Sequence, residues 1–123
     1  DIENPIFGNK ARRGTADGKG VMCQSFGVWF DYGRAFAIER ISGVVSHRTM
    51  SSYNERTPNV LIWNDPVGGG FNGVRMKLSR KLLILKRYSE IHYPPTQCKL
   101  VKTQKELFDL VEQVDDASQD NKI

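Results

Sequence analysis

The sequence predicts an α+β fold: a bent antiparallel sheet or partial β-barrel, preceded by an irregular arm and followed by an amphipathic helix. Apolar and β-branched runs of strand length, separated by turns rich in Gly and Pro, fill residues 21–103. Four glycines and few large apolar groups occur in residues 1–20, whereas apolar residues recur at helical spacing near the other end. We therefore divide a single domain of 123 residues into an arm (1–20), a β-rich body (21–103), a helix (104–116) and a frayed tail (117–123).

The first part of the body predicts a β-hairpin. Residues 21–30 and 35–46 are strand-like, and the segment between them contains Gly33, which can adopt the positive φ that hairpin turns require. In the first strand, alternation puts Trp29 on the face opposite Val28 and Phe30. We therefore expect Trp29, together with Tyr32 in the turn, to be exposed.

The middle of the body predicts loops around one short strand. Residues 47–58 are polar and predict a loop of about a dozen residues, and residues 59–63 predict a strand. Residues 68–73 form a glycine-rich loop, but the chain contains neither GxxxxGK[ST] nor GxGxxG. The sequence therefore predicts no nucleotide cofactor.

The segment 72–93 combines dense apolar and dense positive residues. Val74, Met76 and Leu78 alternate with Arg75 and Lys77, which predicts a strand with one apolar face and one cationic face. Residues 79–92 fit either a second strand or a helix, because a run of four apolar residues does not distinguish the two periods. The neighbouring strands favour the strand. A last short strand is expected over residues 97–102.

The end of the body has a clear helix signal. Thr103 and Glu106 have the S/T-x-x-E spacing of a capping box. Leu107, Val111 and Val114 then follow at helical spacing, so we expect a helix over residues 104–116 whose apolar stripe packs on the sheet.

Cysteine usage and hydropathy bear on location. Cys23 and Cys98 lie far apart without a CxxC partner, and we interpret both as free thiols in a reducing compartment, cytoplasmic or nuclear. No apolar run approaches the length of a membrane span, so no transmembrane segment is expected.

Charge is distributed unevenly along the chain. Residues 1–103 hold 16 Lys and Arg against 8 Asp and Glu, a net charge of +8, whereas residues 104–123 hold 2 against 6, a net charge of −4. A basic body attracts polyanions, of which nucleic acid is the most frequent. A solvated surface that only maintains solubility is the competing interpretation.

Catalytic and metal-binding patterns are missing from the sequence. His47 and His92 are the only histidines, and neither lies in an HxxxH or HExxH context. The serines lack a GxSxG elbow, and no cysteine has a histidine beside it. We expect no metal and no catalysis. Among enzyme classes, a histidine-assisted ribonuclease fits the sequence best.

These observations favour a non-enzymatic domain that binds DNA or RNA, with single strands preferred. Such sites combine a positive surface that follows phosphates with aromatic faces on which bases stack. Trp29 and Tyr32 are the candidate stacking residues, and small barrels of the OB type use a similar arrangement. The candidate phosphate contacts are Lys10, Arg12, Arg13, Lys19, Arg34, Arg75, Lys77, Arg80, Lys81, Lys86 and Arg87.

Two alternatives from other classes remain. The order of elements, strands closed by one C-terminal helix, is similar to that of pleckstrin-homology-like domains, which implies a protein or anionic-lipid interaction module. A small inhibitor or adaptor that docks on an acidic protein partner is the other. Exposed aromatic residues distinguish nucleic acid from lipid headgroups, because only bases stack. Either a monomer or a homodimer is compatible with the sequence.

Overall fold

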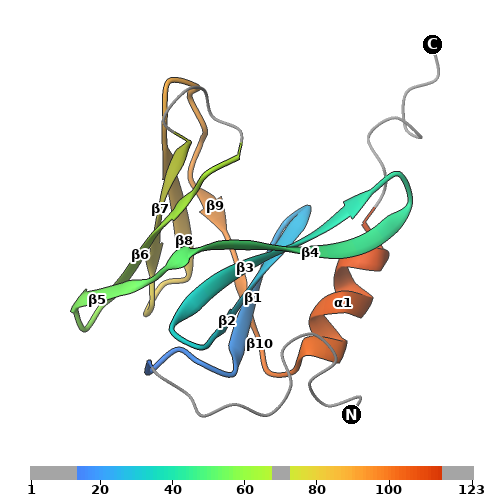
Figure 1. Ribbon diagram of the computed structural model, residues 1–123, viewed down its shortest axis with the longest axis horizontal. Coiled ribbons are helices and arrows are strands. Elements are labelled where there is room, and N and C mark those ends of the chain that lie inside the picture. Colours follow the sequence, from blue (N-terminus) through green and yellow to red (C-terminus); the bar gives the residue numbers. More distant parts are fainter. Residues whose placement is uncertain (1–13, 68–72, 115–123) are drawn as a thin grey trace.

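The computed structural model describes residues 14–67 and 73–114, which form two antiparallel five-stranded sheets and one helix (Figure 1). The elements in these residues are β1 (Lys19–Cys23), β2 (Phe26–Asp31), β3 (Arg34–Ile41), β4 (Val44–Ser52), β5 (Asn54–Thr57), β6 (Val60–Asp65), β7 (Val74–Ser79), β8 (Ile84–Tyr88), β9 (Thr96–Gln97), β10 (Lys99–Val101) and α1 (Gln104–Glu112).

The first sheet has the order β10-β1-β2-β3-β4, and two-residue turns join β1 to β4 in sequence. Tyr32 and Gly33 both have positive φ, as do Ser42 and Gly43, which matches the right-handed twist of the strands they connect. The predicted turn at Gly33 is therefore confirmed. The prediction of one strand over residues 21–30 is wrong, because the chain reverses at Gln24, which adopts a φ of 64°.

The second sheet has the order β5-β6-β7-β8-β9. The loop predicted over residues 47–58 is largely strand, since β4 continues into β5 with only Tyr53 between them. The ambiguous segment 79–92 contains strand β8, so the favoured interpretation is correct. The strand predicted over residues 97–102 is divided at Cys98 into β9 and β10.

Two corners join the sheets, and this arrangement replaces the single bent sheet or partial barrel that the sequence predicted. β4 and β5 belong to different sheets and meet at Tyr53, while β9 and β10 belong to different sheets and meet at Cys98. The described strands are hydrogen-bonded as two separate sheets and do not form a closed barrel.

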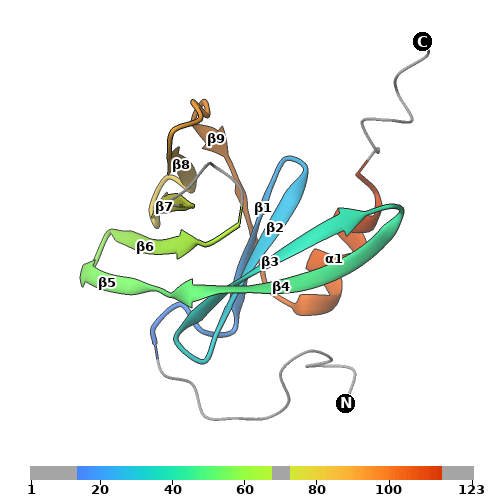
Figure 2. The ribbon, with the colours of Figure 1, turned by 45° about the horizontal axis from the view of Figure 1, so that its top comes forward.

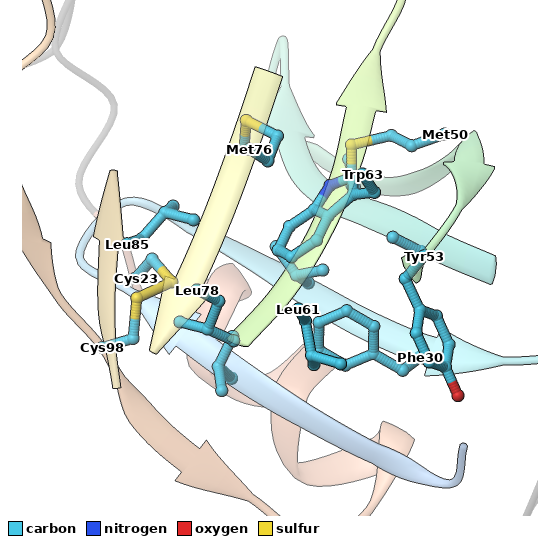
Figure 3. Close-up of a cluster of buried hydrophobic side chains, with 14 of the residues drawn as sticks. Cys23, Phe30, Met50, Tyr53, Leu61, Trp63, Met76, Leu78, Leu85 and Cys98 are labelled. Carbon is cyan, nitrogen blue, oxygen red and sulfur yellow. A yellow bond between two sulfur atoms is a disulfide. The ribbon is translucent and has the colours of Figure 1, made fainter. Parts of the chain in front are cut away.

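The main core lies between the two sheets (Figure 3). Trp63 on β6 packs edge-on against Phe30 on β2, with ring centroids 5.2 Å apart, and Tyr53 contacts the same ring from the corner. Alternation in β7 turns Val74, Met76 and Leu78 toward this core, as predicted.

A second core lies between the first sheet and α1, so the molecule has three layers (Figure 2). Leu107 and Val111 are fully buried against the outer face of the sheet, where Gly27 leaves room for the Leu107 side chain. Trp29 lies in this layer and is only 4% exposed, so the prediction that it is exposed is wrong. Trp29 points away from the inter-sheet core, and it is buried because α1 covers that face of the sheet.

The predicted helix start is confirmed, and its end lies earlier than predicted. The Thr103 hydroxyl accepts a hydrogen bond from the Glu106 amide at 3.1 Å, while the Glu106 carboxylate accepts from the Lys102 amide at 3.3 Å. The helix ends at Glu112, and Arg40 donates a hydrogen bond to the carbonyl of Val114. The predicted tail at 117–123 lies outside the described residues.

Cys23 and Cys98 form a disulfide, which overturns the prediction of free thiols. The bond joins the end of β1 to the corner between β9 and β10, and both cysteines are buried in the inter-sheet core (Figure 3). Disulfides are typical of oxidising compartments. The thiol argument for a cytoplasmic or nuclear location therefore no longer holds, and the location stays a prediction.

The other corner is held by a buried carboxylate. Asp17 precedes β1, is 2% exposed, and accepts a hydrogen bond of 2.6 Å from the Tyr53 hydroxyl. Its oxygens also accept from the backbone amides of Gly14 and Gly33 at 3.0 to 3.1 Å. Asp17 thus connects the turn before β1, the hairpin between β2 and β3, and the β4–β5 corner.

Because the Tyr53 hydroxyl is buried against Asp17, we expect the protein to lose stability at alkaline pH. Burial, followed by the hydrogen bond to Asp17, raises the pKa of Tyr53 above its ordinary value of 10. The folded state therefore holds this proton more tightly than the unfolded chain, and the stabilisation is complete below pH 10 and declines as the pH rises above 10. Urea unfolding between pH 9 and 11.5 should show a steeper loss of stability for the wild type than for Tyr53→Phe. Parallel curves would contradict this assignment.

Candidate nucleic-acid interface

The outer face of the second sheet gathers exposed cations. On β7, Arg75 and Lys77 are exposed while their neighbours are buried, in the alternation that the sequence predicted. On β8, Lys86 is exposed and Leu85 is fully buried, so the same rule places Lys86 on the outer face.

Strand register brings these cations together. Lys77 lies directly opposite Lys86, and Arg75 lies directly opposite Tyr88, whose side chain is 50% exposed. Directly opposed residues have Cβ atoms about 5 Å apart, and residues two apart on one strand lie about 7 Å apart. Arg75, Lys77, Lys86 and Tyr88 therefore form one continuous patch, which we call the basic face.

The charge of the basic face is not neutralised by the described part of the molecule. Four ion pairs occur among the described residues, and none involves Arg75, Lys77 or Lys86. Directly opposed like charges, such as Lys77 and Lys86, destabilise a sheet. An anion lying over the pair would relieve this repulsion.

Two other predicted cations of the same segment point elsewhere. Arg80 donates to the Thr15 hydroxyl at 2.8 Å and pairs with Glu55 at 3.4 Å. Arg87 alternates with Lys86 and faces inward, where its guanidinium lies 4.4 Å from the ring centre of Tyr93 and 5.4 Å from that of Phe26. These two candidate phosphate contacts therefore do not lie with Arg75, Lys77 and Lys86 on the outer face.

The remaining candidates are dispersed. Lys81 is exposed in the turn between β7 and β8, whereas Lys19 and Arg34 are exposed on strands of the first sheet. The candidate stacking residues Trp29 and Tyr32 both pack in the helix layer, Trp29 buried and Tyr32 half-buried. Three further candidates lie outside the described residues: Lys10, Arg12 and Arg13.

Sequence reasoning missed Tyr88 as the exposed aromatic residue beside these cations. Its register opposite Arg75 puts it on the outer face, and no described element covers that face. The signal was present, because Tyr88 lies two positions after Lys86 and shares its face in a strand. It was hidden by the unresolved choice between strand and helix for residues 79–92.

A second charged cluster joins the two sheets but is already paired. Arg48 on β4 donates to Glu39 on β3 at 3.1 and 3.2 Å and to Asp65 on β6 at 2.9 Å. The hydrogen bond to Asp65, followed by that to Glu39, raises the pKa of Arg48. The cluster borders a cavity of about 240 Å³, and because one cation is paired with two carboxylates it offers no attraction for a polyanion.

The described residues contain no group of three or more His, Cys, Asp or Glu side chains positioned to hold a metal ion. His47 lies on β4 and His92 in the segment after β8, both exposed. Within the same residues, no helix has the length and apolar character needed to cross a membrane.

Comparisons with protein families, with curated proteins and with solved structures found no match for this chain. The geometry of the basic face is therefore the starting point for a functional assignment.

Proposed function

We propose that this chain binds single-stranded nucleic acid without catalysis, and that the basic face is the contact surface. The observation that carries the proposal is the juxtaposition of three cations lacking ion-pair partners among the described residues with an exposed tyrosine. Cations that follow a backbone and an aromatic ring on which a base can stack are the two parts of a single-strand site.

The distribution of charge between the two sides of the molecule also supports binding at the basic face. Helix α1 covers the far side of the first sheet and exposes Glu106, Asp109 and Glu112 to solvent. The outer face of the second sheet thus carries exposed cations that pair with no described carboxylate, whereas the helix layer on the opposite side mixes these carboxylates with the exposed Lys102 and Lys105. A polyanion is therefore attracted more strongly to the basic face than to the helix layer.

The exposed tyrosine favours nucleic acid over an anionic lipid headgroup, since a headgroup offers no ring for stacking. Binding at this face requires no particular compartment and no cofactor. A pleckstrin-homology-like lipid module remains the runner-up, to be distinguished by the experiment below.

The test is charge reversal of the basic face. The triple variant Arg75→Glu, Lys77→Glu, Lys86→Glu should bind a single-stranded oligonucleotide at least 100-fold more weakly than wild type at low salt. The slope of log affinity against log salt should fall by about 2, because each lost phosphate contact removes about 0.7. Fluorescence anisotropy at four salt concentrations measures both quantities.

The matched control reverses three exposed cations away from the basic face: Lys99, Lys102 and Lys105. This control has the same net charge as the test variant and should retain most of the affinity. Tyr88→Ala should weaken binding about 5- to 100-fold, as expected for one lost stacking contact. Equal losses in the two triple variants would remove the basic face from the site. Binding to phosphoinositide vesicles that is unaffected by Tyr88→Ala would support the lipid alternative instead.

A further inference from the structure

A cleft opens between the two sheets beside the start of β1, away from the outer face on which the basic face lies. Its volume is about 220 Å³, and apolar side chains from both sheets line it. Val21, Phe30 and Leu100 come from the first sheet, whereas Leu61 and Leu78 come from the second. The cleft is therefore a continuation of the inter-sheet core that reaches solvent.

Leu100 shows that the core is open here. In the register of β1 and β10 it lies opposite Val21, which belongs to the inter-sheet core, so both side chains face inward. Val21 is 2% exposed, but Leu100 is 52% exposed. An inward-facing leucine with half its surface in water indicates that this end of the sandwich lacks a covering element among the described residues.

The opposite wall is held in an unusual conformation. Leu83 has a φ of 57°, which a branched apolar residue rarely adopts. Its amide donates to the carbonyl of Ser79, and its carbonyl accepts from the amide of Cys98, each at 2.8 Å. These hydrogen bonds fix the turn so that Leu83 lines the cleft.

The polar groups that line the cleft are cationic. Lys19 shares the inner face of β1 with Val21, is exposed, and takes part in none of the four ion pairs among the described residues. Arg80 also lines the cleft and forms an ion pair with the carboxylate of Glu55. No described carboxylate lines the cleft itself. An apolar slot with a cation at its mouth matches a ligand that has an apolar chain and an anionic end.

We propose that this cleft binds one medium-chain fatty acid, with the alkyl chain between the sheets and the carboxylate beside Lys19. A volume of about 220 Å³ is below the usual range for drug-sized ligands, which fits a single unbranched chain. This binding is separate from the nucleic-acid contact, because it uses the inner faces of the sheets. The second inter-sheet cavity, beside Arg48, offers no comparable site because the carboxylates of Glu39 and Asp65 line it and would repel an anionic end.

The probe is decanoate below its micelle concentration, titrated into the disulfide-bonded protein by isothermal calorimetry. Wild type should bind one equivalent, and decyltrimethylammonium, with the same chain and the opposite charge, should bind at least tenfold more weakly. Lys19→Glu and Leu100→Asp should each lower the affinity for decanoate at least tenfold. Both positions are exposed, so thermal unfolding should show that the fold is retained.

Two matched controls separate this site from general surface effects. Lys99→Glu and Leu82→Asp alter exposed residues that do not line the cleft and should leave the affinity within twofold of wild type. The triple variant of the basic face should also bind decanoate normally. The absence of binding by wild type, equal binding of the cationic amphiphile, or unchanged affinity in both cleft variants would overturn the proposal.

Discussion

Replacing Cys23 and Cys98 together by alanine should lower the free energy of unfolding by about 4 kcal/mol. The disulfide closes a loop with a sequence separation of 75 residues, and in the chain-entropy description a longer loop gives a greater restriction of the unfolded state. For a domain whose whole stability is about 5 to 15 kcal/mol, this is a large fraction. Urea unfolding followed by tryptophan fluorescence measures the difference.

The wild type unfolded in the presence of a reducing agent provides the control for this prediction. Once reduced, it should resemble the double alanine variant in its unfolding midpoint, apart from the small effect of two truncated side chains. Because both cysteines are buried, reduction should be slow under native conditions and fast in urea. A double variant as stable as the oxidised wild type would show that the disulfide does not stabilise the corner.

Asp17→Ala should cost about 2 to 4 kcal/mol of unfolding free energy, because it removes the acceptor of three buried or half-buried donors. The Tyr53 hydroxyl and the amides of Gly14 and Gly33 all donate to this carboxylate. A donor left unpaired in the interior incurs its full desolvation cost. The same urea experiment gives the value.

Tyr53→Phe separates the contributions at this corner. It removes one of the three donors and keeps the ring that packs on Phe30, so its cost should be smaller, about 1 to 2 kcal/mol. The effects of the two substitutions should not add in the double variant, because they share one hydrogen bond. An Asp17→Ala variant that unfolds at the wild-type midpoint would contradict the structural role assigned to the carboxylate.

Parts of the fold with a clear period could be predicted from the sequence. The alternation of Val74 to Leu78 identifies β7 and its two faces, and the Thr103–Glu106 spacing identifies the start of α1. The polar strand β4 could not be recognised in the same way, since only Met50 among its residues is buried. A strand that lies mostly in solvent has no apolar alternation to detect.

Other features depend on contacts between distant segments. Two cysteines 75 residues apart carry no information on their separation in space. The turn at Gln24 lacks the Asn-Gly or Asp-Gly pair that normally indicates a hairpin. Trp29 was expected in solvent because the sequence predicts the helix but does not show which face of the sheet the helix covers. In the structure α1 packs on the outer face of the first sheet, and this explains the burial of Trp29.

The candidate site was predicted in part. Arg75 and Lys77 share a face because strand alternation is a local property that the sequence displays, whereas Lys86 joins them through the pairing of β8 with β7. The inward direction of Arg87 follows from the same alternation once residues 84–88 are known to be strand. The pairing of Arg80 with Glu55 depends on how β5 and the turn after β7 meet, which no local pattern reveals.

The continuity of β4 with β5 and of β9 with β10 has a consequence for how the molecule comes apart. Each long strand contributes hydrogen bonds to both sheets, so neither sheet can lose its edge without disturbing the other. β1 strengthens this coupling, because Asp17 before it and Cys23 at its end are attached to the two corners. Melting should therefore be a single concerted event with no stable half-folded species.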